Sequence, residues 1–323
     1  MISYQGLGVY GSSLNIEITP EDNINYSYEE GEMPDLINVA YCDVTDIIDL
    51  FNSERGYKVL QKAMNGEITL NLFPTDSVGV NEYERNYLIG HEVIFRKPNI
   101  NLYQTWYDPN LKFNYHVGCT IHTALDSFIK HFRNVEFDKS VKNKHFLTLN
   151  NLHTPVREDL YNLYQSLSEE NKEKFRCSFI FKGIELDNDL PNILNEYEVV
   201  FGKKGGSHYD TTLIEIVSES SEIAITEKTY KPLIIGIPFI SYIHHLDGTV
   251  HQLEYMKDLG IDINYFDIDY LNKESINNKI KELLSMTVDE IRDVYSDDFK
   301  KAKENKKLFL NFIDNLENKL IKR

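Results

Sequence analysis

Regular alternation of short apolar runs with amphipathic segments limits the folds open to this chain, and it begins near residue 145. The runs at 145–151, 174–181, 212–220, 237–243 and 263–268 have the length and β-branched content of strands. Segments between them, at 155–167, 226–236 and 251–260, have helical spacing. Strands that alternate with helices predict a parallel, doubly wound sheet. From about Glu274 to Lys319 the sequence predicts almost continuous helix.

The amino-terminal part also predicts a mixed α/β region. Strands are expected at Leu36–Val44, at 67–74 and at 91–100, and helices at Thr45–Met64 and Gly118–Phe132, with Gly56 a possible break in the first. A chain of 323 residues favours two domains. We therefore expect an α/β domain over 1–140, a Rossmann-like domain over 141–273, and C-terminal helices over 274–323 that could pack back on the first domain. The polar segment FDKSVKNKH marks the boundary.

Charge and composition exclude several classes of protein. The formal net charge is −17 and the pI is near 5.0, which opposes a broad basic surface for nucleic acid. Three widely spaced cysteines form no CxxC pair, which argues against a disulfide framework or structural zinc. No apolar run reaches the ~18 residues of a membrane span, and the first residues lack the pattern of a signal peptide. A cytoplasmic protein is the expectation.

Several short motifs have an ordinary structural interpretation beside a functional one. Gly6-Leu7-Gly8 with Gly11 has no clear strand before it, so a turn is favoured over a phosphate loop. Asp267-Ile268-Asp269 could hold a divalent metal, but a turn at a strand end is favoured. The pair His244-His245 is interpreted as a loop. Aromatic residues Tyr103, Trp106, Tyr107 and Tyr115 could stack on sugars or bases, although core packing is the commoner use of such a cluster.

The segment HFLTLNNLHTPVRED is more informative. A predicted strand ends at Asn150 and Asn151, His153 and Thr154 follow, and Arg157 lies in the first turn of the next helix. The carboxyl ends of parallel strands are where open α/β sheets bind ligands. An arginine there can bind a diphosphate through two parallel hydrogen bonds. The alternative is a surface arginine that pairs with Glu158 or Asp159.

The segment TLIEIVSES, followed by ITEKTYKPLIIGIPFI, repeats this arrangement. The strand ends at Ser218 and Glu219, and Thr226 is a suitable N-cap for a helix that carries Glu227, Lys228 and Lys231. Backbone N–H groups at a helix N-terminus favour an anion, and Lys228 adds a positive charge. A charged first turn without a ligand is the alternative. Pro232 is unfavourable inside a regular helix, and the sequence does not explain it.

The pattern from Glu219 to Ile240, with its TEK-x-x-KP and G-x-PFI elements, resembles the donor-binding domain of fucosyltransferase-like glycosyltransferases. Phage and bacterial glycosyltransferases carry a similar segment. Phe146 to Asp159 resembles the first strand and helix of the same domain. The resemblance covers about 145–270 and implies a GT-B architecture, in which two Rossmann-like domains face a cleft. It also implies that Arg157 and Lys228 hold the donor diphosphate, and that Glu227 binds ribose or sugar hydroxyls.

The resemblance predicts a metal-independent glycosyltransferase that needs no cofactor and moves a sugar from a nucleotide-diphosphate sugar to a hydroxyl of a glycan or another acceptor. The donor-binding candidates are Asn150, Asn151, His153, Arg157, Glu219, Thr226, Glu227, Lys228 and Lys231. An inverting reaction also needs a base, for which Asp43, His91, Glu92 and His116 are candidates. Two alternatives stay open: a non-catalytic binding module with the same fold, and a phage glycosyltransferase that modifies nucleic acid.

Overall fold

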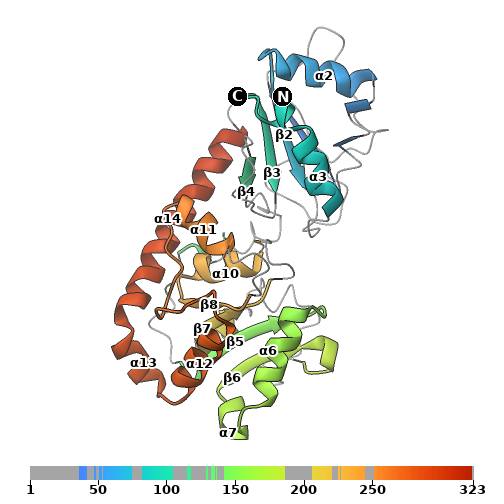
Figure 1. The fold of residues 1–323 in the computed structure, drawn as a ribbon. Coiled ribbons are helices and arrows are strands. Elements are labelled where there is room, and N and C mark those ends of the chain that lie inside the picture. The colour runs from blue at the N-terminus through green and yellow to red at the C-terminus, as the bar shows by residue number, and fades with distance from the viewer. Residues whose placement is uncertain are drawn as a thin grey trace. The chain divides into compact units, whose positions relative to one another are not determined.

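A computed structural model provides the structure of the protein. It describes residues 36–41, 47–48, 51–52, 54–74, 82–104, 115–117, 129, 132–134, 136, 142–185, 206–219, 225, 227–243 and 251–321. The chain divides into two compact units, the first mainly residues 1–126 and the second mainly residues 127–322 (Figure 1). No helix in this described part is both long enough and apolar enough to cross a membrane.

The first unit contains a parallel sheet with the strand order β1-β2-β3-β4. Its strands are β1 (Leu36–Tyr41), β2 (Thr69–Pro74), β3 (Ile100–Gln104) and β4 (Tyr115–Val117). The helices are α2 (Glu54–Met64), α3 (Glu82–Gly90) and α4 (Glu92–Phe95). The expected strands at 36–44 and 67–74 are confirmed in their main parts. Gly56 lies inside α2 and does not divide it.

Leu70, Leu72, Ile100 and Leu102 are fully buried in the core of this unit. Asn71 lies between the two leucines of β2 and is also buried. Its side-chain oxygen accepts a hydrogen bond of 2.8 Å from the amide of Asn101, the residue opposite it in β3. The cross-strand amide pair satisfies polar groups that burial would otherwise destabilise. This explains how β2 can be buried with an Asn in its middle.

The second unit contains a parallel sheet with the order β6-β5-β7-β8. Its strands are β5 (Lys144–Asn150), β6 (Phe175–Phe179), β7 (Thr212–Val217) and β8 (Phe239–Ser241). The connecting helices are α6 (Pro155–Gln165), α7 (Glu169–Lys172), α9 (Gly206–Thr211), α10 (Glu227–Ile235) and α11 (His251–Asp258). The chain ends with α12 (Lys273–Leu284), α13 (Val288–Val294) and α14 (Ser296–Ile321). The α/β class with parallel sheets is thus confirmed, as are the helices expected at 155–167, 226–236, 251–260 and 274–319.

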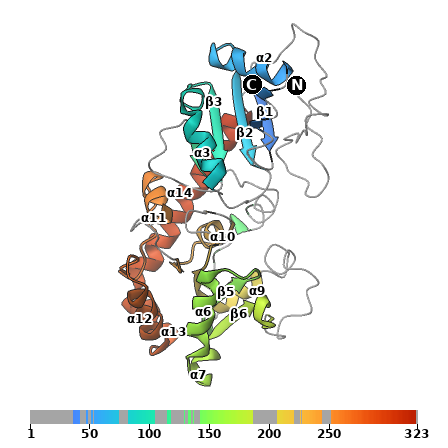
Figure 2. The same ribbon diagram turned by 45° about the vertical axis from the view of Figure 1, so that its right-hand side comes forward.

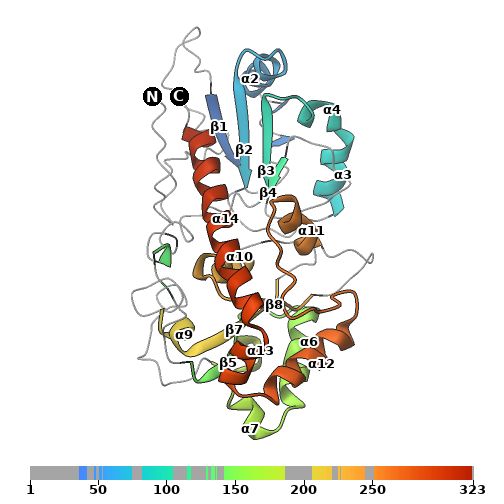
Figure 3. The ribbon, with the colours of Figure 1, turned by 90° about the vertical axis from the view of Figure 1, so that its left-hand side faces the viewer.

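Helices cover both faces of this sheet, as a doubly wound arrangement requires (Figure 2, Figure 3). Tyr161 and Tyr164 of α6 pack against Phe179 on one face, with ring centroids 5.4 and 5.6 Å apart. On the other face, α9 and α10 contact β7, and α14 packs on α10. Burial on both faces accounts for the continuous apolar runs from which the strands were predicted.

Pro232 lies in the last turn of α10. Its carbonyl accepts hydrogen bonds from the N–H groups of Gly236 (2.8 Å) and Ile237 (3.2 Å), which close the carboxyl end of α10. Gly236 has φ +83°, a conformation that glycine adopts without a steric penalty. A Cβ added at Gly236 would lie 3.0 Å from Cδ of Lys306 on α14. Gly236 therefore ends α10 and lets α14 approach it closely, whereas any residue at position 232 could supply the same carbonyl.

Two predicted strands are wrong. Residues 91–100 form α4 and a turn, and β3 begins only at Ile100. Residues 263–268 contain a turn with positive φ at Phe266 (64°) and Asp267 (51°). The N–H of Phe266 donates to Oδ2 of Asp298 (3.1 Å), and the buried ring of Phe266 packs on Tyr295. A tertiary partner thus satisfies a backbone group that a strand would have paired with a neighbour.

Other expectations lie outside the described residues. These are the glycine-rich segment at 6–11, Asp43, most of the helix expected at 118–132, and the histidine pair at 244–245.

Phe309 of α14 stacks on Tyr230 of α10, with centroids 5.0 Å apart and planes inclined by 16°. It is 2% exposed, whereas the neighbouring Leu308 is 44% exposed. We expect Phe309→Ala to lower the free energy of unfolding by about 3–5 kcal/mol, because it removes a buried ring and leaves a cavity. Leu308→Ala is the matched control and should change it by less than about 0.5 kcal/mol. Urea unfolding followed by circular dichroism measures both, and equal effects would contradict the packing described here.

Candidate functional site

The strand order identifies one edge of the second sheet as the place for a ligand. β6 lies on one side of β5, and β7 lies on the other. The chain therefore reverses its winding direction at β5 and β7, and the carboxyl ends of these strands form a topological switch point. Ligands of open α/β sheets bind outside the carboxyl ends at such a point. Asn150 ends β5, and Ser218 and Glu219 follow β7, so they lie at this edge.

A buried hydrogen-bond network joins the strand ends. The Asn150 side-chain oxygen accepts a 2.5 Å hydrogen bond from the Ser218 hydroxyl, and its amide donates to Oγ1 of Thr148 (3.1 Å). Thr148 Oγ1 in turn donates to the carbonyl of Ile216 on β7 (3.0 Å). The Asn150 backbone N–H donates to Oγ of Ser178 on β6 (3.3 Å). The network fixes the relative positions of β6, β5 and β7 at the candidate site.

Arg157 connects the loops that follow β5 and β7. It lies in the first turn of α6, where Oγ1 of the N-cap Thr154 accepts a hydrogen bond from its backbone N–H (3.3 Å). The guanidinium is buried, and it donates to the carbonyls of Leu152 (Nη1, 2.9 Å) and Ser218 (Nη2, 3.3 Å). The alternative of a surface arginine is therefore wrong.

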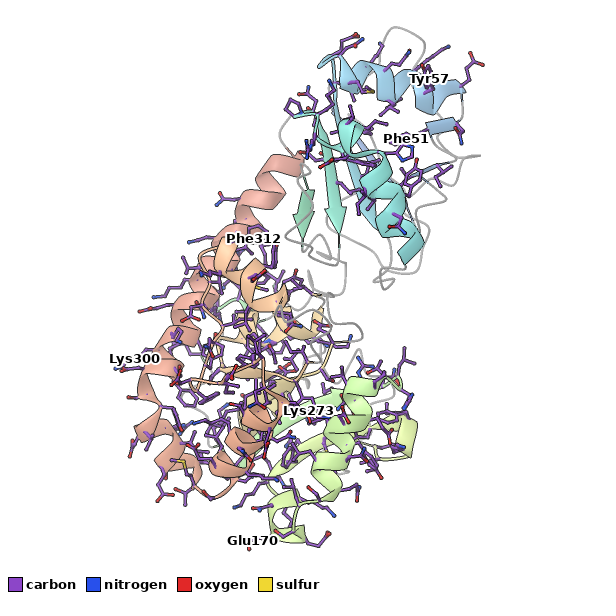
Figure 4. The ribbon with its side chains drawn as sticks, in the orientation of Figure 1. Phe51, Tyr57, Glu170, Lys273, Lys300 and Phe312 are labelled. Carbon is purple, nitrogen blue, oxygen red and sulfur yellow. The ribbon has the colours of Figure 1, made fainter. Side chains whose placement is uncertain are left out.

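The two carboxylates considered as partners of Arg157 form ion pairs elsewhere. Glu158 pairs with Lys182 (2.8 Å), and this hydrogen bond holds the pKa of the carboxyl below its usual value. Asp159 pairs with Lys273 of α12 (2.5 Å), a residue labelled in Figure 4. The first turn of α6 thus joins the residues after β6 to α12.

Glu219 forms the link between the end of β7 and α10. Its side chain is buried, and Oε1 accepts a hydrogen bond from Oγ1 of Thr229 (2.7 Å), which is also buried. Lys228 precedes Thr229 and is half-buried. Thr226 and the side chain of Glu227 lie outside the described residues, although Glu227 begins α10. The structure therefore brings Asn150, Arg157 and Glu219 to one edge, with the start of α10 following closely in the chain.

Lys231 of α10 is a buried lysine close to Glu215, a buried carboxyl group inside β7. It is 7% exposed, and its charge acts on Glu215 in β7. Burial raises the pKa of Glu215 to about 8, while Lys231 and the hydroxyl of Tyr209, which donates to Oε2 (3.0 Å), favour the charged form. This buried group is a structural feature of β7 that apolar periodicity alone did not predict.

Asn151 and His153 are exposed beyond the end of β5. His153 Nε2 lies 3.2 Å from Oε2 of Glu158, so the two form an ion pair when the imidazole is protonated. Both residues border the site.

Sequence reasoning missed four polar residues of this edge as site residues: Thr148, Ser178, Ser218 and Thr229. All four are buried hydrogen-bonding groups in or next to apolar elements. For the first three, the signal available in the sequence was a hydroxyl residue near the carboxyl end of a largely apolar strand. Thr229 lies in α10, where this signal does not apply.

Three of the four candidates for the base lie in the described part of the first unit. His91 and Glu92 join α3 to α4, ahead of the start of β3. His91 stacks on Tyr87 (4.1 Å between centroids), and Glu92 pairs with Arg96. His116 lies in β4, opposite Tyr103 in β3, and Asp43 is outside the described residues. The assignment of a base stays a prediction.

In the part of the chain that the structure describes, no group of three or more His, Cys, Asp or Glu side chains could hold a metal ion. The carboxylates of the Asp267–Asp269 motif are exposed, and Oδ1 of Asp269 accepts a hydrogen bond from the N–H of Leu271 (3.1 Å). That local bond is typical of a turn.

Comparisons with protein-family models, with curated proteins and with solved structures give no match for this chain. The arrangement of the residues at this edge is therefore the basis for a functional proposal.

Arg157→Leu tests the linking role of the guanidinium. We expect a loss of about 2–4 kcal/mol in the free energy of unfolding, because two loop carbonyls lose their donors in a buried place. Lys281→Leu on the exposed surface of α12 is the control, with an expected change within about 0.5 kcal/mol. Urea unfolding measures both, and an Arg157→Leu effect as small as the control would show that the guanidinium does not hold the loops.

Glu215 should make stability depend on pH. The pKa of the Glu215 carboxyl is raised in the folded state. Its contribution to the free energy of unfolding is therefore fully present below its pKa in the unfolded chain, about 4.5, and is lost as the pH rises through about 8. Glu215→Gln should therefore flatten the fall in the free energy of unfolding between pH 5 and pH 8. Glu304→Gln, an exposed residue of α14, should leave the fall unchanged. Urea midpoints at pH 5, 6.5 and 8.5 measure this, and parallel curves for wild type and Glu215→Gln would contradict it.

Proposed function

We propose that this protein is a glycosyltransferase that binds a nucleotide-diphosphate sugar at the carboxyl edge of the second sheet and transfers the sugar to a hydroxyl acceptor. The observation that carries the proposal is the meeting of Asn150, Arg157, Ser218 and Glu219 at the switch point of a parallel α/β sheet. Buried polar groups are costly unless they are satisfied, so such a concentration is characteristic of a site that must be held in one geometry.

The chemistry of the leaving group suits this edge. Transfer from a nucleotide sugar releases a diphosphate, whose growing negative charge must be stabilised by fixed positive groups or dipoles. Helices α6 and α10 both follow strands of the sheet and begin at its carboxyl edge, so their N-terminal N–H groups are directed toward an anion there. Lys228 in the first turn of α10 adds a full charge. These groups supply positive potential without a metal, in accordance with the metal-independent reaction inferred from the resemblance.

Arg157 would act in this function in an indirect way. Both of its Nη atoms donate to backbone carbonyls, so its role is to hold the loops after β5 and β7 and to place a positive charge beneath the diphosphate. Lys228 is then the side chain expected to contact the phosphates, and Glu219 would act by positioning α10 through Thr229.

The two units, each with a parallel sheet, would be the two halves of a GT-B enzyme in this proposal. The first unit would then bind the acceptor and supply the base from among Asp43, His91, Glu92 and His116. A carboxylate or an imidazole can accept the proton of the attacking hydroxyl.

One observation favours the non-catalytic alternative. Arg157 is 1% exposed and both of its Nη atoms donate to backbone carbonyls, so the residue that the resemblance assigns to the diphosphate has a structural role here. A binding module that keeps the fold would bind a nucleotide or a glycan at the same edge and show no turnover.

Nucleotide sugars test the proposal directly. We expect GDP-, UDP- or dTDP-sugars to raise the melting temperature of the full chain, and one of them to be slowly hydrolysed. Lys228→Ala should weaken this binding by about tenfold or more, the scale of one charge-assisted contact to phosphate. Lys281→Ala should bind as the wild type does. Absence of binding across the three classes of donor would refute the proposal, and binding without hydrolysis or transfer would favour the binding module.

A further inference from the structure

A connected group of aromatic and charged side chains lies just beyond the end of β6. We name it the β6-end cluster, and it consists of His153, Glu158, Tyr161, Phe181 and Lys182. Phe181 is the central ring, with centroids 5.4 Å from His153, 6.3 Å from Tyr161 and 6.1 Å from Phe179. Those three contacts are edge-on, with interplanar angles of 66–81°, so none of them is a parallel stack.

The charged members of the cluster are arranged around the rings. Lys182 Nζ lies 5.2 Å from the ring centroid of Tyr161 and 5.7 Å from that of Phe181, and it pairs with Glu158. His153 approaches the same carboxylate from the other side. Side chains of this kind combine a π surface with hydrogen-bonding groups, as sites for flat polar rings do.

Phe181 lies in a hydrogen-bonded turn of the backbone. After β6 the chain forms a 3₁₀ turn at Ile180–Lys182, and Gly183 with φ +72° reverses its direction. Phe179 and Ile184 then pair with each other through hydrogen bonds of 2.8 and 3.1 Å. A rigid turn presents a side chain without an additional entropic cost on binding. Ile180 in the same turn is 45% exposed, and Leu152, next to His153, is 68% exposed.

The cluster also borders the proposed nucleotide site. His153 directly follows Leu152, whose carbonyl Arg157 binds, and Glu158 directly follows Arg157. Strands β5 and β6 are adjacent, and neighbouring strands lie ~4.8 Å apart. A ligand whose phosphates occupy the end of β5 would therefore extend over the end of β6 within the length of one ribose.

We propose that the β6-end cluster binds the nucleoside part of the nucleotide sugar, with the base stacked against Phe181. The inference rests on the proposed function and adds to it the direction in which the donor lies, from the switch point toward β6. A nucleoside fits better than an unconnected glycan, because the diphosphate ties it to the end of β5. Lys182 and Glu158 supply a donor and an acceptor for the base or the ribose at the rim.

The experiment compares nucleoside diphosphates with inorganic pyrophosphate on the full chain, by calorimetric titration. The main variant is Phe181→Leu, which keeps an apolar side chain but removes the aromatic face. Phe181→Ala extends the series, and Phe312→Ala on α14, labelled in Figure 4, is the control for loss of a half-buried aromatic ring. Thermal unfolding of each variant verifies that it is folded.

We expect Phe181→Leu to weaken the nucleoside diphosphate by about tenfold, the lower range of base–aromatic stacking, and Phe181→Ala by at least as much. The affinity for pyrophosphate should stay within about twofold, and Phe312→Ala should match the wild type.

Unchanged nucleoside diphosphate affinity in Phe181→Leu would overturn this inference and leave the proposed function intact. Equal losses for nucleoside diphosphate and pyrophosphate would overturn it too, since they would indicate a general distortion. If the wild type binds no nucleoside diphosphate more tightly than it binds pyrophosphate, both this inference and the proposed function fail.

Discussion

The hydrogen bonds of Arg157 are the interaction on which the second unit's ligand edge depends. One guanidinium holds the carbonyls of Leu152 and Ser218, and the Ser218 hydroxyl in turn binds Asn150. Two loops that belong to different strands, and that lie some sixty residues apart in the chain, are thereby held in a fixed relation. Loss of these contacts would leave two loop carbonyls without their donors, which is costly in a buried place. The contacts restrict the movement of both loops, and a rigid edge binds a diphosphate at a lower entropic cost.

The opposite edge of the same sheet uses positive charge for another purpose. Lys144 donates to the carbonyl of Glu173 at the end of α7 (2.5 Å), and Lys174 to the carbonyl of Leu284 at the end of α12 (2.6 Å). Nε2 of His145 is 2.8 Å from the carbonyl of Met286 just after α12. Helix carboxyl ends carry partial negative charge, and cations there satisfy their last carbonyls. The cations at the amino edge thus stabilise helix ends, whereas those at the carboxyl edge remain near the proposed diphosphate.

Much of the fold could be predicted because burial leaves a periodic pattern in the sequence. The strands β5 and β7 are buried on both faces and consist largely of apolar residues, and Thr154 and Pro155 mark the start of α6 as N-cap and first helical residue. The errors have a common cause. Val93, Ile94 and Phe95 are β-branched or aromatic, yet they form a helical turn in which only Phe95 is buried. At Phe266 the backbone N–H donates to the carboxylate of Asp298, a residue 32 positions away, and this bond replaced strand pairing. No local pattern contains that distant partner.

The sequence by itself determined the α/β class, the parallel order implied by strand–helix alternation, and the polar character of the segments after β5 and β7. These are consequences of periodicity and of residue type, which short windows of the chain express. Only the tertiary structure decided which polar groups meet. It directed Arg157 inward to two carbonyls, buried Lys231 near Glu215, and brought His153 into contact with both Phe181 and Glu158 at the end of β6. Those choices depend on strand order and on the packing of α6 and α10, which bring together residues that no sequence spacing relates.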